Sequence, residues 1–540
     1  MWQQNYTPLG QSIGWSALGA ALPMLVLLLL LAGLRKPAWK SSVGALAAAV
    51  IVAWAVYGMP AERIVSAALC GASFGLLPIG WITFNSILLY RVTLETGQFE
   101  TIKNSLTSLT TDRRLQALLI AFAFGAFIEG AAGSGVPVAV GAAMLAGLGF
   151  SPLQAACICL IANTAPVAFG AIGTPIITLN ATTNIPLASL SSCVGRLTAP
   201  LSLCIPSYLM VLVGGRRGLR GALPASLVCG ISFATVHFLV SWRIGPQLTD
   251  VLASLTAMAC LVALLRVWEP TDPEFRVADS VTASRRKLAT GEVWRGWMPY
   301  ILLAALVLLW GWPPVRLALE KASPLIQWPG LHNQVMRMPP VVREAAPYAA
   351  IYKLDWLASP GTACLLASIL AAMFAGLSPR RFLKVWKATF DTMFFPLVTI
   401  ASVLALAFLM NYCGATATLG LAFAGSGALF PFFSPLLGWM GVFLTGSDAS
   451  ANALFGNLQV VTAQRLGLDP VLMASANSAG GVMGKMISVQ TIAVATAATG
   501  MKTSEENVLF RFTFWRSLIL ASAMGLLTTI FAYLLPQYVQ

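Results

Sequence analysis

Three ionisable side chains stand inside stretches of sequence that are otherwise apolar. Glu129 lies in FIEGAAGSGVPVAVG (127–141), Asp448 in TGSDAS and Lys485 in GVMGKMIS. An ionised carboxylate is costly in apolar surroundings, which makes Glu129 and Asp448 plausible proton carriers. Lys485 could pair with Asp448 or with an anionic ligand. The alternatives are structural carboxylates that accept backbone N–H groups, and a lysine whose ammonium extends to the nearest polar boundary.

Small hydrogen-bonding side chains and glycines accompany these charges. Amide and hydroxyl groups can bind both a carboxylate and a neighbouring hydroxyl, whereas glycines let the backbone turn and leave N–H groups that favour an anion. A small hydroxy-carboxylate fits such a set, and a large amphipathic compound does not. The predicted ligand-binding residues are Ser134, Asn163, Thr164, Ser450, Asn477, Ser478 and Lys485, and the predicted turn residues are Gly130, Gly133, Gly135, Gly446 and Gly484.

The elements that must position these residues are membrane helices. Of the 540 residues, 58% are hydrophobic and only 10% are charged, whereas an ordinary soluble domain has about 25% charged residues. Apolar runs of about 20 residues, each long enough to cross a hydrocarbon core roughly 30 Å thick, recur along the whole chain. The sequence thus predicts an all-α polytopic membrane protein with about 12–14 transmembrane helices. The predicted spans are 14–34, 42–59, 63–90, 115–130, 152–172, 187–213, 221–241, 247–267, 297–312, 359–377, 390–411, 419–445, 470–486 and 508–536.

The formal net charge of +14 does not indicate a nucleic-acid partner, because the basic residues lie in short clusters between the apolar runs. Such clusters are typical of cytoplasmic loops. They predict that the N-terminus lies outside and that residues 268–296 lie in the cytoplasm. The clusters are Arg35, Lys36 and Lys40; Arg113 and Arg114; Arg216, Arg217 and Arg220; Arg285, Arg286 and Lys287; and Arg380, Arg381, Lys384 and Lys387.

The stretches around Glu129 and Asp448 resemble each other. FIEGAAGSG begins at Phe127 and FLTGSDASA at Phe443, and each is followed by a proline, Pro152 or Pro470, that opens another apolar run. Polar interruptions then come at 161–176, around Asn163–Thr164, and at 475–492, around Asn477–Ser478. The Gly- and Ser-rich stretches 131–150 and 446–468 are predicted re-entrant hairpins. Because the loop charges give the two copies opposite directions, the repeat is predicted to be inverted, a pattern typical of secondary transporters.

This repeat divides the chain into four predicted parts. They are N-terminal transmembrane helices (1–59), a first repeat half (60–267), a cytoplasmic linker (268–296) and a second repeat half (297–540). The second half contains the polar segment 313–358, which has two interpretations: a solvated outer loop with local ion pairs, or a segment that folds back over a substrate entrance.

Two further residues are weaker candidates. Arg196, in SSCVGRLTAP, is another possible partner for an anion. His237, in ATVHFLV, could relay protons, although a lone histidine on an apolar face is more often a packed residue. The sequence has no Gly-rich Lys-Ser/Thr loop for nucleotides, no metal-ligand cluster and no Ser-His-Asp set. It therefore predicts neither an enzyme nor a bound metal or cofactor, and uphill transport would have to use an ion gradient.

Long runs of sequence carry a family pattern over nearly the whole chain. They are WQQNYTPLG, GAFIEGAAGSGVPVA, LIANTAPVAFGAIGTPI, RMPPVVREAAPYAAIYKLDW, FFSPLLGWMGVFLTGSDASANALF, GGVMGKMISVQTIA and LFRFT. In these runs the sequence resembles the bacterial L-lactate permease family of lactate and glycolate proton symporters. Three positions depart from that family's pattern: Ser134 where an aromatic residue is usual, Thr174 where an aliphatic residue is usual, and Val489 where proline is usual.

The resemblance implies import of L-lactate, and of related 2-hydroxymonocarboxylates such as D-lactate and glycolate, with a proton across the bacterial inner membrane. We therefore expect an electroneutral symporter that works by alternating access, with a small monocarboxylate and a proton as its partners. Sodium coupling is the first alternative, since unwound helices rich in Asn and Ser can also coordinate Na⁺. A passive carboxylate channel is the second.

Overall fold

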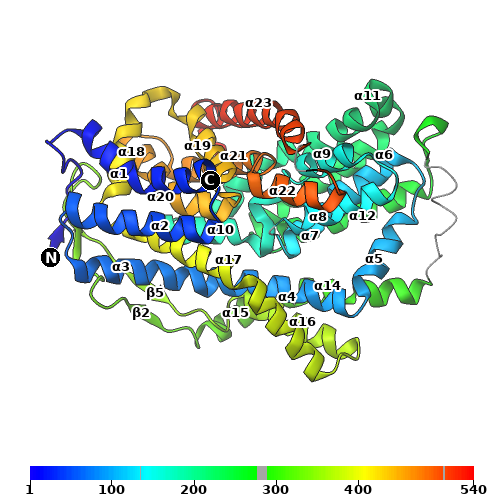
Figure 1. Cartoon of the computed structure of the whole chain (residues 1–540), viewed down its shortest axis with the longest axis horizontal. Helices are drawn as coiled ribbons and strands as arrows, with labels where there is room; N and C mark the ends of the chain where they lie inside the picture. Colours follow the sequence, from blue (N-terminus) through cyan, green and yellow to red (C-terminus); the bar gives the residue numbers. More distant parts are fainter. Residues whose placement is uncertain (134, 277–288, 503–504, 540) are drawn as a thin grey trace.

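The protein is a bundle of membrane-length helices (Figure 1). The computed structural model describes residues 1–133, 135–276, 289–502 and 505–539. Within these residues ten helices are long and apolar enough to cross a membrane, or up to eleven if the bent pair Pro152–Ala162 and Val167–Thr183 is one span. Every predicted span overlaps a helix. The predicted all-α polytopic fold is thereby confirmed.

The helices have the following bounds. In the first half of the chain they are α1 (Ile13–Leu28), α2 (Ala38–Ile51), α3 (Ala61–Phe74), α4 (Trp81–Glu95), α5 (Gln98–Thr107), α6 (Arg113–Gln116), α7 (Gly125–Ala131), α8 (Val136–Gly147), α9 (Pro152–Ala162), α10 (Gly170–Thr183), α11 (Leu187–Arg243) and α12 (Thr249–Leu265). In the second half they are α14 (Thr290–Gly311), α15 (Pro313–Glu320), α16 (Pro360–Phe374), α17 (Pro379–Cys413), α18 (Ala415–Phe423), α19 (Phe430–Thr445), α20 (Asp448–Leu466), α21 (Pro470–Lys485), α22 (Val489–Thr499) and α23 (Glu506–Tyr533). Stretches of π-helix at Leu29–Gly33, Val52–Val56, Gly75–Gly80 and Ala117–Phe124 extend or join α1, α2, α3–α4 and α6–α7.

Five short strands lie outside the helical bundle. They are β1 (Trp2–Gln3), β2 (Leu325–Gln327), β3 (Val335–Arg337), β4 (Ala346–Pro347) and β5 (Ile351–Lys353). The N-terminal β1 pairs in parallel with β3, β3 pairs with β4, and β2 pairs with β5. The N-terminus and the segment 313–358 must therefore lie on the same side of the membrane, in agreement with the predicted topology.

The segment 313–358 is packed rather than freely solvated. Trp328 donates its indole N–H to the carbonyl of Ser66, 2.9 Å away, and the hydroxyl of Tyr352 donates to the carbonyl of Leu77 at 3.0 Å. Lys353 forms ion pairs with Glu320, at 2.9 Å, and with Asp355, at 4.0 Å. The hydrogen bond from Lys353 lowers the pKa of the half-buried Glu320 carboxyl. The segment thus folds back onto α3 and the π-helical stretch Gly75–Gly80 that follows it.

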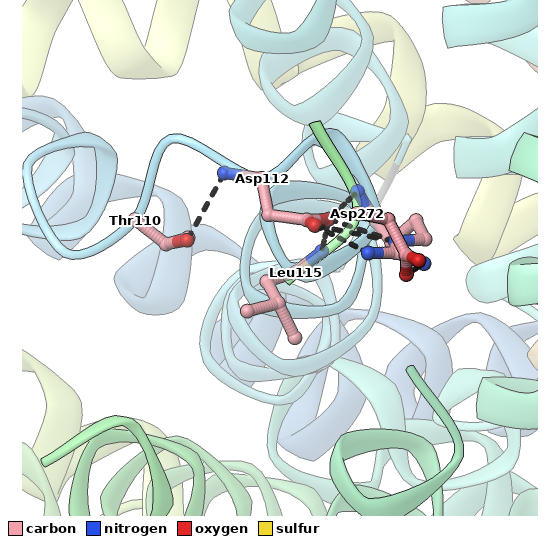
Figure 2. Close-up of polar contacts among 5 residues, drawn as sticks. Thr110, Asp112, Leu115 and Asp272 are labelled. Carbon is pink, nitrogen blue, oxygen red and sulfur yellow. Dashed lines mark hydrogen bonds and ion pairs between the residues drawn. The ribbon is translucent and has the colours of Figure 1, made fainter. Parts of the chain in front are cut away.

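A buried arginine, Arg114 of α6, joins three segments. Helix α6 lies toward the opposite end of the long axis from the N-terminus (Figure 1). The guanidinium of Arg114 donates to Asp112, with Nη2 2.7 Å from Oδ2, and to Asp272, with Nη1 2.8 Å from Oδ2 (Figure 2). Its other face stacks on the ring of Phe275 at 4.1 Å. The same ring fills the space beside Gly214, where a Cβ atom would come within 2.4 Å of it, and there the backbone of α11 leaves helical geometry.

The predicted repeat corresponds to one order of helices that occurs twice. In the first copy, a first break lies between the end of α7 at Ala131 and the start of α8 at Val136, and a second break at 163–169 separates α9 from α10. In the other copy, α19 and α20 are separated at 446–447, and α21 and α22 at 486–488. Proline is the first residue of both α9 and α21, where its missing N–H costs nothing. The inverted orientation and the re-entrant character of the hairpins stay predictions.

One predicted break is misplaced. Asn163 ends α9, as expected, but α21 continues without interruption through Asn477 and Ser478 and ends only at Lys485. The reason is packing. Gly438 and Gly480 let α19 and α21 approach so closely that a Cβ atom on either would come within 2.0 Å of a carbonyl oxygen of the other helix. A helix buried at such close range keeps its own backbone hydrogen bonds, and the polar pair on it is satisfied by side chains instead.

Candidate functional site

The breaks of both repeat copies meet at one cavity of about 630 Å³. It is lined by Gly133 and Gly135 from the first break, by Ala171 and Thr174 at the start of α10, and by further residues of the second copy and of α2, α4 and α17. The lining residues of the second copy are Thr445, Gly446, Ser447, Asp448, Ala449, Ser450, Lys485, Gln490, Thr491 and Val494. No residue of 313–358 lines it.

Glu129 and Lys485 form an ion pair that links the two copies. The ammonium of Lys485 lies 3.0 Å from Oε1 of Glu129, and their side chains are 8% and 2% exposed. Both residues are in the last turn or two of a helix that ends at a break, α7 or α21. Gly170 makes room for the carboxylate, since a Cβ there would come within 2.6 Å of Oε1. Oε2 has no hydrogen-bond partner among the described residues, so one oxygen of this carboxylate can still bind a proton or accept a hydrogen bond.

Asp448 is the second carboxylate of the cavity and begins α20. Its Oδ2 accepts a hydrogen bond from the hydroxyl of Ser478 at 2.6 Å and a longer one from Asn452 at 3.5 Å. A carboxylate in the first turn of a helix is favoured by the helix dipole. Ser447 caps the same helix by accepting the N–H of Ser450 at 3.3 Å. Oδ1 of Asp448 lacks a partner among the described residues.

Asn477 and Ser478 lie behind Asp448 and do not line the cavity. The amide of Asn477 donates to Oδ1 of Asn452 at 2.9 Å and accepts from Gln459 at 3.2 Å. Asn452 also donates to the carbonyl of Pro175 at 3.1 Å, which ties α20 to the first copy. These residues therefore hold Asp448 in place. The sequence did not single out Asn452 or Gln459, although both lie on the face of α20 that carries Asp448, at spacings near the helical period.

At the second break of the first copy, α10 begins with a strained backbone conformation. Ala171, Ile172 and Gly173 all have positive φ angles, of 45°, 58° and 75°. Positive φ is costly for Ala and Ile and is tolerated where the surroundings enforce it. Here a Cβ atom added to Gly133 would come within 2.9 Å of the Cβ of Ala171, so the two breaks of the first copy touch. The cluster of Gly170, Gly173 and Pro175 in the sequence was the signal for this turn.

Other predicted residues lie away from the lining. Asn163 is buried with both amide atoms unpartnered among the described residues, and the hydroxyl of Thr164 donates to the carbonyl of Ile161 at 2.6 Å. Gly130 and Gly484 are sites of close helix contact, against Asp250 and Trp439. Arg196 donates to the carbonyl of Tyr538 and does not line the cavity. Ser134 falls outside the described residues.

A further cation of the lining was missed. Arg91, near the end of α4, faces the cavity and donates to the hydroxyl of Thr392 on α17 at 2.9 Å. The charged residues of the described lining are thus Arg91, Glu129, Asp448 and Lys485. When all four are ionised, their formal charges cancel.

Comparison with known proteins places the chain in a family. The L-lactate permease family matches residues 16–535. The L-lactate permease of Bacillus subtilis is 45% identical over 99% of this chain and 100% of its own length. The chain belongs to the L-lactate permease family. The L-lactate permease of Escherichia coli K12 is 42% identical over 99% of both chains, and the glycolate permease GlcA of the same strain is 41% identical over 98% of both.

A solved structure of the Alcanivorax borkumensis YdaH transporter has a TM-score of 0.44 and 15% identity, with 86% of each chain covered. This distant likeness carries no argument about the site. Membership of a permease family, together with the membrane-length helices, makes the chain a multi-pass integral membrane transporter.

Proposed function

We propose that this protein imports L-lactate, and related 2-hydroxymonocarboxylates such as D-lactate and glycolate, together with a proton across the bacterial inner membrane. The names of its relatives, L-lactate permease and glycolate permease, support the substrate class. The observation that carries the proton coupling is the cavity-lining ion pair of Glu129 and Lys485, in which one carboxylate oxygen is unused.

The charges of the cavity explain why one proton would accompany one substrate. Its four lining charges already cancel, so an added monocarboxylate would leave one uncompensated negative charge in a buried site, which is costly. A proton that binds Glu129 removes this cost and also frees Lys485 from its partner. Lys485 then binds the carboxylate of the substrate, and the Thr174, Ser447 and Ser450 hydroxyls are available for its 2-hydroxyl group.

Uptake of radiolabelled L-lactate into proteoliposomes tests the proposal. With an imposed proton gradient we expect accumulation above the external concentration, and competition by unlabelled glycolate. If accumulation instead follows an imposed Na⁺ gradient, the coupling ion is sodium rather than the proton. If lactate only equilibrates and does not accumulate under either gradient, the protein is a passive channel.

The variant Glu129→Gln tests the proton site itself. It mimics the protonated carboxyl and leaves Lys485 free for substrate, so lactate exchange across the membrane should continue while accumulation driven by the pH gradient is abolished. The matched control is Glu100→Gln, which removes an exposed carboxylate whose ion pair among the described residues is with Lys103. Undiminished accumulation in Glu129→Gln would remove Glu129 from the coupling mechanism.

A further inference from the structure

Another buried carboxylate, Asp250, lies next to the end of α7 that carries Glu129. It is the second residue of α12, its side chain is fully buried, and it does not line the cavity. A Cβ atom on Gly130, the residue after Glu129, would come within 2.8 Å of the Cβ of Asp250. Asp250 therefore packs against the helix turn that carries Glu129. Neither carboxylate oxygen of Asp250 has a hydrogen-bond donor among the described residues.

The imidazole of His237 on α11 contacts Asp250. Nδ1 of His237 lies 3.4 Å from Oδ1 of Asp250, and both side chains are fully buried. The ring is held between Phe169, at a centroid distance of 4.9 Å, and Phe233, at 5.5 Å. On its other side Nε2 lies 2.9 Å from the hydroxyl oxygen of Thr198.

The hydrogen bonds of Thr198 bear on which nitrogen of His237 carries its proton. The Thr198 hydroxyl has one hydrogen, and both the carbonyl of Val194, at 2.8 Å, and Nε2 of His237, at 2.9 Å, are within reach of it. When that hydrogen goes to Val194, the hydroxyl oxygen accepts from Nε2–H of His237. In the neutral ring this arrangement leaves Nδ1 without a hydrogen, facing an oxygen of Asp250.

Two bare acceptors in contact, in a site closed to water, are unfavourable, and an ionised carboxylate without a donor is costly to bury. One additional proton removes both problems. It can reside on Oδ1 of Asp250 or on Nδ1 of His237. The two atoms lie 3.4 Å apart without a hydrogen bond in this structure, so a small approach of the side chains would let them share the proton.

We propose that Asp250 and His237 together form a second proton-binding site, which exchanges its proton with Glu129 during transport. The inference rests on the proposed proton coupling and deepens it. When the proton passes to Glu129, the pair becomes an ionised carboxylate beside a neutral imidazole, and Glu129 becomes a carboxylic acid that releases Lys485. The total charge of the region does not change in this step.

Few other titratable groups face this pair. Glu129 approaches from α7, with Lys485 of α21 bound to it. The π-helical stretch Ala117–Phe124, which also packs on α12, has no titratable residue. Cys229 and Cys260 lie about two to three turns farther along α11 and α12. The proton of the pair thus has Glu129 as its nearest acidic exchange partner among the described residues.

Infrared difference spectroscopy of the purified protein in lipid tests the shared proton without any transport. Difference spectra between acid and alkaline pH should contain a carboxylic-acid C=O band that disappears in Asp250→Asn and shifts in His237→Gln, which removes the ring but keeps a polar side chain. The control is Asp391→Asn, which changes an exposed carboxylate on α17. If neither variant alters the carboxylic-acid bands, the pair holds no titratable proton and the inference is overturned.

Transport by the same variants tests the exchange with Glu129. In Asp250→Asn we expect uptake driven by a pH gradient to fall by at least about tenfold, as for loss of a proton-transfer group, while lactate exchange at equal pH is retained. An equal loss of uptake and exchange would mean a merely structural role and would overturn the inference. If the unaltered protein shows no proton-driven accumulation, the proposed function fails. If the carboxylic-acid band is nevertheless lost in Asp250→Asn, the pair binds a proton that plays no role in transport.

Discussion

Gly480 and Gly481 are neighbours on α21, but their substitution by alanine should have different effects. One change should impair the binding site, and the other should destabilise the helix packing. A Cβ at Gly481 would come within 2.3 Å of Oδ1 of Asp448, so in Gly481→Ala the carboxylate must rotate away from Ser478. Loss of a hydrogen bond to a charged group costs about 1.5–3 kcal/mol, and we expect lactate uptake to fall about tenfold or more.

In Gly480→Ala the new Cβ would instead meet the carbonyl oxygen of Pro435 at 2.0 Å, and backbone cannot rotate away. We expect this variant to lose about 1–3 kcal/mol of stability, seen as a lower unfolding temperature in detergent. Gly291→Ala, with no atom within 4 Å of the new Cβ, is the control. The assignment would be contradicted if Gly480→Ala left the unfolding temperature unchanged while Gly481→Ala lowered it.

The residues that the sequence could and could not predict differ in a physical way. Glu129, Asp448 and Lys485 were found because a charge in an apolar run needs a partner or a wet cavity, and all three line the cavity. The pairing of Lys485 with Glu129 was not found, because it joins residues 356 positions apart. Asp250 was missed for a related reason, since it stands at the start of a helix, where an acidic residue is common.

The helices and breaks of the candidate site were predictable only in part. Apolar length predicted the helices, and glycine clusters predicted the breaks after Ala131 and Thr445. The prediction of a break at Asn477–Ser478 was wrong, because the sequence cannot distinguish a polar pair that interrupts a helix from one that binds a neighbouring helix. That distinction depends on Gly438 and Gly480, which form the close contact between α19 and α21 and are separated in the chain by the whole of α20.

The contacts of Arg114 tie three elements together, and the two aspartates should contribute unequally. Asp112 is 6% exposed, and it also caps α6 by accepting the N–H of Arg114 at 2.8 Å (Figure 2). Asp272 is 41% exposed. Breaking a buried pair costs about 3–5 kcal/mol, whereas an exposed pair contributes about 0–1 kcal/mol. We expect Asp112→Asn to lower the unfolding temperature strongly and Asp272→Asn only slightly. Equal effects of the two substitutions would show that the burial of Asp112 is not what matters.

At the scale of the whole molecule, the strand pairing fixes which loops share a side of the membrane. Since β1 pairs with β3, single cysteines at Asn5 and at Glu344 should both react with a membrane-impermeant maleimide, and the positive-inside pattern predicts that they do so in intact cells. Both positions are exposed. A cysteine at Glu269, which is also exposed and lies close to Asp272, should react only after the membrane is permeabilised.

The parent protein is the control for this experiment, because its cysteines are buried, half-buried or, for Cys204, on the outer face of a membrane-length helix. If Asn5 and Glu344 react from opposite sides, the β1–β3 pairing is wrong. If both react from the side opposite to that predicted, the pairing holds and the orientation inverts. In that case Arg114 and its aspartates would lie outside. The direction of substrate and proton movement past Glu129 and Lys485, relative to this structure, would then be the reverse of the one proposed.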